Sequence, residues 1–305
     1  MSSTDHNTSG EVSTAEFFSK QAAMYEKSVG GATRDIAQKL ISVSPPFTSS
    51  SKILDNATGT GIMLEEIQKH ISSTDSSSTL KLPVVAADVA PAMIDCLNAK
   101  LKQVQSTNSW PNLGPVTTHA VPAEQLDESI VPDNSITHAY MNFGLFFCND
   151  ALQAASHIHR ALSAGGTAHI TSWNHIGYLA PIQQTHRELY PDGREVKMPF
   201  SEDWLHPSYN HELLVKAGFK QENVKVDQTE TFMRHTSLQV SAAILTGMFT
   251  PLIKGPQGWE SEEAKTVFTK KLAENLGACK DFIDESAQGK GVGTRMIANV
   301  AVCTK

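Results

Sequence analysis

Cysteine is scarce and scattered in this chain. The 305 residues contain four cysteines with no C-x-x-C pair among them: Cys96, Cys148, Cys279 and Cys303. In so long a chain this pattern predicts reduced, mostly packed thiols rather than a disulfide framework. No apolar run approaches the roughly 20 residues that a membrane helix needs, and the polar N-terminus lacks the charged-then-apolar layout of a signal peptide. We therefore expect a cytoplasmic protein with no membrane partner.

Concentrated positive charge is absent as well. The formal net charge is −7, and no run of Lys or Arg stands out. Nonspecific binding to nucleic acid needs a concentrated positive field, so we expect no nucleic-acid partner. The histidines, cysteines and acids show no metal-ligand spacing, and no Ser-His-Asp or Cys-His set is evident. The sequence thus disfavours a metal site. A small molecule is the expected substrate, and a protein acceptor is the alternative.

The length suits one large α/β domain with additions or two small domains. We expect residues 1–13, which are small and polar, to be disordered, and residues 14–305 to form a single domain. Within it, 14–175 hold the ligand-binding core with N-terminal helices, 176–255 form a lid and acceptor region, and 256–305 supply a helix and a strand that returns to the sheet.

Strand and helix patterns alternate along most of the chain. Such alternation predicts a doubly wound, mostly parallel sheet with helices on both faces. The expected architecture is an α/β, Rossmann-like sheet of seven strands, with a lid inserted after the fifth. The strands are expected at 52–56, 83–87, 116–121, 136–141, 167–173, 223–226 and 294–304.

Residues 53–61 (ILDNATGTG) carry the strongest functional signal. A short apolar strand ends at Asp55, the glycines Gly59 and Gly61 follow, and a helical pattern begins at once. Glycine lets a ligand approach the backbone, and a helix start offers free N–H groups. The acid at the strand tip would repel a pyrophosphate and attract an ammonium group. Asp88, at the end of the second strand, can accept hydrogen bonds from a ribose diol, or it can cap the helix that begins near Pro91.

Two nucleotide-type ligands fit this pattern. A dinucleotide fingerprint requires a third glycine and an acid about 20 residues on, whereas here Leu64 occupies the third position and Asp88 follows Gly61 by 27 residues. A nicotinamide-dependent oxidoreductase is therefore the second hypothesis. A third is a protein that binds a methionine-derived cofactor without transferring its methyl group.

Three ordered motifs resemble class I S-adenosylmethionine-dependent methyltransferases of the ubiquinone/menaquinone-biosynthesis type. They are LDNATGTG, AADVAPAMIDCLNAK and HAYMNFGLFFCNDALQAASHIHRALSAGGTAHITSW, within roughly residues 15–175. A narrower likeness is to fungal secondary-metabolite methyltransferases such as the gliotoxin S-methyltransferase group. The resemblance implies S-adenosyl-L-methionine as the cofactor.

The resemblance also implies a set of cofactor residues. Asp55, Gly59 and Gly61 would hold the methionine moiety, and Asp88 the ribose hydroxyls. Met93 would flank adenine, with core packing as the alternative for this residue. Tyr25 would fold over the cofactor, Ala123 or Glu124 would contact adenine, Asn142 and Phe143 would lie near the sulfonium, and Ala57, Thr60 and Val89 would complete the set.

Methyl transfer needs alignment rather than a covalent intermediate, and positioning alone can supply roughly 7–11 kcal/mol. We expect direct in-line displacement onto an S, O or N atom of a secondary metabolite. His175, directly after the fifth strand, is the candidate base; a surface role is the alternative. Apolar residues are typical of small-molecule sites, and those expected to bind the acceptor, or alternatively to pack in the core, are Phe146, Phe147, Trp173 and Tyr178.

Overall fold

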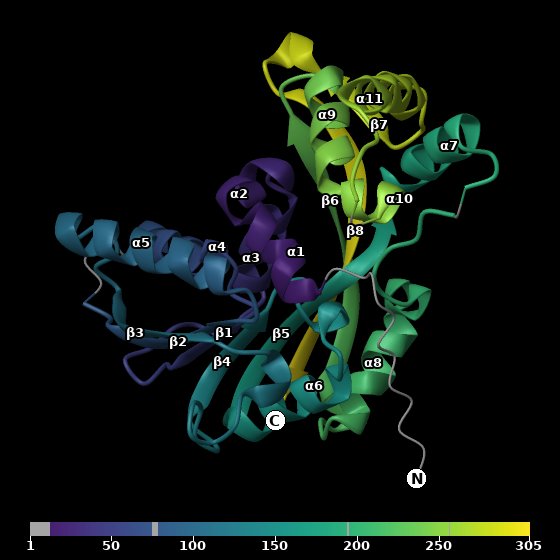
Figure 1. Cartoon of the computed structure of the whole chain (residues 1–305). Coiled ribbons are helices and arrows are strands. Elements are labelled where there is room, and N and C mark those ends of the chain that lie inside the picture. The colour runs from purple at the N-terminus through teal and green to yellow at the C-terminus, as the bar shows by residue number, and fades with distance from the viewer. Residues whose placement is uncertain (1–12, 75–78, 194, 256) are drawn as a thin grey trace.

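A computed structural model describes residues 13–74, 79–193, 195–255 and 257–305 (Figure 1). The expectation of disorder for residues 1–13 falls, apart from Ser13, outside the described residues. One open sheet runs through the molecule in the order β3-β2-β1-β4-β5-β8-β6, with β7 paired to β8. The strands are β1 Ile53–Asn56, β2 Leu82–Asp88, β3 Leu113–Ala120, β4 Ile136–Met141, β5 Leu162–Ile176, β6 Val224–His235, β7 Phe282–Glu285 and β8 Gly291–Thr304.

The sheet confirms the expected α/β class. Strands β1 to β5 run parallel to one another, while β8 runs antiparallel to both of its neighbours, β5 and β6. The expected count of seven strands was one short, because β7 adds a short eighth strand at β8. β6 is also much longer than the predicted 223–226, since it pairs with β8 from Val224 to His235.

Helices cover the sheet on both sides. Figure 1 shows α3, α4 and α5 on one side and α6 and α8 on the other, with α7, α9 and α11 grouped around the extended ends of β5, β6 and β8. None of the helices in the described ranges combines the length and the hydropathy needed to cross a bilayer. The helices are α1 Thr14–Gln21, α2 Tyr25–Ser28, α3 Ala32–Ser42, α4 Ile62–Thr74, α5 Pro91–Thr107, α6 Ala151–Ala161, α7 Leu179–Leu189, α8 Pro207–Lys216, α9 Leu238–Met248, α10 Thr250–Lys254 and α11 Glu262–Gly277.

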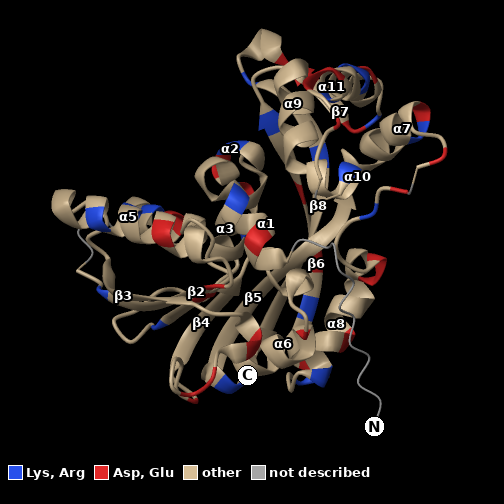
Figure 2. Cartoon of the chain, viewed as in Figure 1, with Lys and Arg blue, Asp and Glu red and all other residues tan. Residues whose placement is uncertain are grey.

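The central strands are apolar because helices bury both of their faces. All four residues of β1 are buried, which is typical of a parallel strand at the centre of a doubly wound sheet. Figure 2 shows Lys, Arg, Asp and Glu mainly on helices and loops, while the strands are mostly free of charge. The main core therefore forms between the sheet and its helices, and the ends of the central strands remain available for a site.

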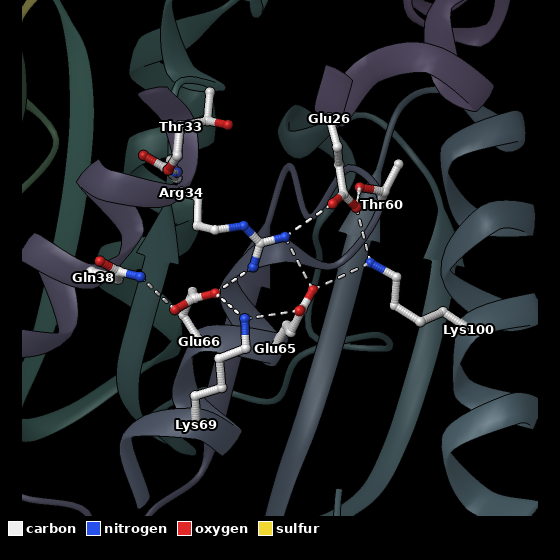
Figure 3. Close-up of polar contacts among 10 residues, drawn as sticks. Glu26, Thr33, Arg34, Gln38, Thr60, Glu65, Glu66, Lys69 and Lys100 are labelled. Atoms are coloured by element: carbon white, nitrogen blue, oxygen red, sulfur yellow. Dashed lines mark hydrogen bonds and ion pairs between the residues drawn. The ribbon is translucent and has the colours of Figure 1, made fainter. Parts of the chain in front are cut away.

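A network of charged residues fastens the N-terminal helices to this core (Figure 3). Arg34 of α3 contacts Glu26 of α2 at 2.9 Å and Glu65 of α4 at 3.2 Å, and it also pairs with Glu66. Lys100 of α5 contacts Glu26 at 3.0 Å. Burial alone would raise the pKa of Glu66, but hydrogen bonds from Gln38, Lys69 and Arg34 hold it below its ordinary value. The network thus joins four helices through ionised side chains.

We predict that Arg34→Met lowers the free energy of unfolding by about 2 kcal/mol, because it leaves the buried Glu66 carboxylate short of a partner. Urea unfolding followed by circular dichroism measures this change. Lys20→Met is the control, since Lys20 pairs with Glu16 on the surface and its loss is worth less than about 1 kcal/mol. Equal stability of Arg34→Met and wild type would contradict a fastening role for the network.

Candidate active site

Two cavities adjoin at the carboxyl ends of the parallel strands, each with about 710 Å³ of empty volume. The strand-end cavity is lined by the residues that follow β1, β2, β3 and β4, together with side chains of α1 and α2. The aromatic cavity is lined by residues of α1, β5 and α9, among others. Four side chains line both cavities and form a shared wall: Phe18, Tyr25, Phe143 and Phe147.

Most of the predicted cofactor residues meet in the strand-end cavity. They come from five separate segments of the chain, which the topology of the sheet brings to one edge. Those that line the cavity are Tyr25, Ala57, Gly59, Asp88, Val89, Met93, Ala123, Glu124, Asn142 and Phe143.

The Asp88 carboxylate joins two loops of the strand-end cavity. Its Oδ2 accepts a hydrogen bond from the Gly59 N–H at 2.8 Å, and its Oδ1 accepts one from the Ala90 N–H at 2.9 Å. Burial raises the pKa of Asp88, and these two hydrogen bonds oppose that rise. Asp88 is therefore both a cap at the start of α5 and a residue of the cavity, so the two interpretations of its role are compatible.

Gly59 lies where the loop after β1 faces open space. Its φ is +54°, a conformation that L side chains rarely adopt, and no other atom would lie within 4 Å of an added Cβ. A ligand can therefore approach the Gly59 backbone closely.

Three predicted contact residues lie behind the cavity instead of on its surface. Asp55 is buried and accepts a hydrogen bond from the Thr58 hydroxyl at 2.5 Å. The Thr60 hydroxyl donates to Glu26 at 2.8 Å. A Cβ on Gly61 would lie 2.6 Å from Leu97, so this glycine permits close packing of the loop on α5. These residues shape the glycine loop, and none of them lines the cavity.

Asn56 is a cavity residue that the sequence reasoning missed. It is 1% exposed and lines the strand-end cavity, and its Nδ2 has no hydrogen-bond partner among the described residues. A buried amide without a partner is costly, which makes Asn56 a natural donor to a bound ligand. Its position in the sequence could have indicated this role, because Asn56 directly follows Asp55 at the end of the same strand.

A strained turn after β4 separates the two cavities. Phe143 has a φ of +59°, which is unusual for a bulky residue. Its N–H donates to the Thr171 hydroxyl at 2.8 Å, and that hydroxyl donates to Asn142 Oδ1 at 2.9 Å. The Phe143 ring stacks on Trp173 with 3.9 Å between ring centroids. The turn therefore holds one aromatic ring in contact with both cavities.

The aromatic cavity contains all four residues predicted to bind an acceptor: Phe146, Phe147, Trp173 and Tyr178. Among the described residues that line it there is no Asp, Glu, His, Lys, Arg or Cys. Burial raises the pKa of Tyr25 and of Tyr178 well above the usual range, so both phenols stay protonated. The predicted lid contributes Met198, Pro199 and Phe200 to this cavity, among others, although β6 within the same range belongs to the sheet.

His175 lies outside both cavities. Its Nε2 contacts Asp281 Oδ2 at 2.8 Å, and it lines neither cavity. The pairing of β5 with β8 is irregular between Trp173 and His175, so strand alternation fails there and the two side chains need not share a face. The geometry does not bring the candidate base to the acceptor. No group of three or more potential metal ligands occurs in the ranges that the structure covers.

Comparison with known proteins finds relatives of this chain among methyltransferases. Residues 54–170 match the family model described as a methyltransferase domain. The chain is 24% identical to acetylaranotin bis-thiomethyltransferase of Aspergillus terreus over 87% of this chain and 91% of that protein. It is 30% identical to the mitochondrial 2-methoxy-6-polyprenyl-1,4-benzoquinol methylase of Schizosaccharomyces pombe over 46% of this chain and 43% of that one.

A solved structure shares the fold. Phosphoethanolamine N-methyltransferase 2 of Haemonchus contortus, solved with phosphomonomethylethanolamine and S-adenosylhomocysteine, superimposes with a TM-score of 0.53 at 16% identity. The match covers 96% of this chain and 60% of that protein, so the chain spans less than two thirds of its length.

Residues 54–170 therefore match a methyltransferase domain, and the relatives and the shared fold support a class I S-adenosylmethionine-dependent methyltransferase. S-adenosyl-L-methionine is the cofactor that this similarity supports.

We predict a pH-dependent cost of burying Asp55. Burial raises the pKa of this carboxyl to about 7 from an ordinary value of 3.8. Between these two values the folded state binds more protons than the unfolded state, so the free energy of unfolding falls as pH rises through this window. Asp55→Asn cannot ionise and can still accept the Thr58 hydrogen bond. Wild type should therefore lose stability relative to Asp55→Asn from about pH 4 to pH 7.

Urea unfolding at a series of pH values measures this difference. Asp95→Asn, a change at an exposed position of α5, is the control and should track wild type. A difference between wild type and Asp55→Asn that stays constant from acid to neutral pH would contradict the prediction.

Proposed function

We propose that the enzyme transfers the methyl group of S-adenosylmethionine to the thiol sulfur of a small apolar molecule. The observation that carries this proposal is the lining of the aromatic cavity. It adjoins the strand-end cavity through four shared side chains, and its described residues offer no group that can take up a proton.

The strand-end cavity offers hydrogen-bond donors and acceptors that suit S-adenosylmethionine. Asn56 Nδ2 is a buried donor without a partner among the described residues, and it is suited to the carboxylate of a methionine moiety. Asp88 would accept the ribose hydroxyls through the lone pairs that its backbone hydrogen bonds leave free. Met93 would lie against adenine, with Ala123 and Glu124 beside it. When bound, the cofactor supplies a methyl group on a positively charged sulfur.

The described lining of the aromatic cavity contains no general base, and this favours a thiol acceptor. A thiol has a pKa of about 8.5, whereas a phenol has one of about 10. A thiol therefore reaches the reactive anion at neutral pH far more often than a phenol does, without help from the protein. The residues of the aromatic cavity need only orient the acceptor and exclude water, while Phe143 and Tyr25 hold the boundary where the methyl group passes.

A relative supports the same acceptor atom. The bis-thiomethyltransferase of Aspergillus terreus aligns over 87% of this chain and 91% of its own length, so the likeness is not confined to the expected cofactor core. On this basis we assign the enzyme to fungal secondary metabolism.

We predict that Asp88→Ala weakens S-adenosylhomocysteine binding by about tenfold to a hundredfold, because it removes hydrogen bonds to a charged group. Isothermal titration measures the affinity. Asp95→Ala, on an exposed face of the neighbouring helix, is the matched control and should bind as wild type does. Unchanged affinity in Asp88→Ala would remove Asp88 from the site, and tighter binding of NAD than of S-adenosylhomocysteine would favour the oxidoreductase hypothesis.

We predict that isotopically labelled S-adenosylmethionine transfers its methyl group to aromatic and aliphatic thiols, and far more slowly to matched phenols and amines. Mass spectrometry of the products and of S-adenosylhomocysteine measures both yields. Exclusive methylation of phenols or amines would overturn the choice of a thiol. Binding of S-adenosylmethionine without any S-adenosylhomocysteine formed across the panel would count against transfer itself.

A further inference from the structure

The aromatic cavity holds two buried polar atoms that the protein leaves without partners. Gln21 and Thr33 both line the cavity. Neither Gln21 Oε1 nor Thr33 Oγ1 has a hydrogen-bond partner in the described part of the chain, and Thr33 is only 5% exposed. The other polar groups of the lining side chains are the phenols of Tyr25 and Tyr178 and the indole N–H of Trp173. The aromatic cavity therefore has few polar side chains.

A buried polar group without a partner destabilises a protein by about 1–3 kcal/mol, and most such groups in native structures are hydrogen-bonded. Retention of two of them in an otherwise apolar cavity indicates a ligand that supplies the missing hydrogen bonds. The two groups would recognise a ligand by hydrogen bonding and would not take up a proton, because neither an amide nor a hydroxyl serves as a base at neutral pH.

Thr33 is also held in a fixed position relative to the wall between the cavities. Asn142 Nδ2 donates to the Thr33 backbone carbonyl at 2.9 Å, and Asn142 Oδ1 accepts from the Thr171 hydroxyl, which in turn accepts from the Phe143 N–H. Figure 3 shows Thr33 on α3, in the turn that also carries Arg34. The Thr33 backbone is thus tied to the same turn that places Phe143.

We propose that Thr33, assisted by Gln21, is a specificity-determining residue that reads a hydrogen-bonding group of the acceptor, a hydroxyl or an amide, in addition to its thiol. The proposal rests on the aromatic cavity being the acceptor site of the proposed function. A site built to hydrogen-bond a polar group rejects the analogue that lacks it, because its own buried group then stays unpaired. The acceptor class is therefore a mostly apolar thiol with one polar handle.

The test uses unreactive product analogues, so it does not depend on turnover. Aryl methyl thioethers with a hydroxyl or carboxamide at the ortho, meta or para position are titrated into the S-adenosylhomocysteine complex, beside the unsubstituted parent. Wild type should bind the best polar analogue at least tenfold more tightly than the parent. Thr33→Val should reduce this preference to less than threefold, and Thr33→Ser should restore it.

Thr167→Val is the matched control. Thr167 Oγ1 is likewise buried without a partner among the described residues, but Thr167 lines neither cavity. This variant should keep the wild-type preference, and all variants should keep their S-adenosylhomocysteine affinity within twofold, since Thr33 lies outside the strand-end cavity.

The outcomes separate the two proposals. A preference that survives in Thr33→Val, or no polar preference in wild type, overturns the role of Thr33. Failure of every analogue to bind overturns that role and the acceptor cavity together. A Thr33-dependent preference without methylation of the corresponding thiols leaves the recognition role standing and overturns the proposed transfer.

Discussion

The hydrogen bond from the Gly59 N–H to Asp88 is the interaction on which the rest of the site depends. It joins the loop after β1 to the loop after β2, and Ala90 donates to the same carboxylate from the start of α5. One buried acid thus fixes the spacing of two strand ends. Asp55 and Gly61 support the arrangement from behind, through Thr58 and through close packing on Leu97. Both segments that this carboxylate joins contribute residues to the lining of the strand-end cavity.

The sequence predicted the parallel part of the sheet well, because the strands between covering helices are short apolar runs that end at polar residues or glycine. It predicted β6 poorly. Val224–His235 mixes polar and apolar residues, since this edge strand is exposed at several positions, and its length is set by pairing with β8. Such pairing between segments far apart in the chain leaves no local pattern to read.

The site was predictable at the level of segments and less so at the level of side-chain direction. The strand-end rule found Asp88, Gly59 and the Asn142–Phe143 turn, all of which line the cavity. It could not tell that Asp55 points away while its neighbour Asn56 lines the cavity, because a one-residue difference reverses the direction of a side chain on a strand. The irregular pairing beside His175 removed the alternation on which its expected orientation rested.

Helix α2 explains how charged side chains lie close to the two cavities and yet outside the aromatic cavity. Tyr25 and Glu26 are consecutive, and consecutive residues of a helix point about 100° apart. Tyr25 lines both cavities, whereas Glu26 joins Arg34 and Lys100 in the network that fastens the helix. The charged network therefore stabilises the apolar wall without lining it. The described residues of this wall include no Asp, Glu, His, Lys or Arg. Under the proposed function, the choice of acceptor therefore falls to the nucleophile's own pKa and to the few polar atoms that the aromatic cavity retains.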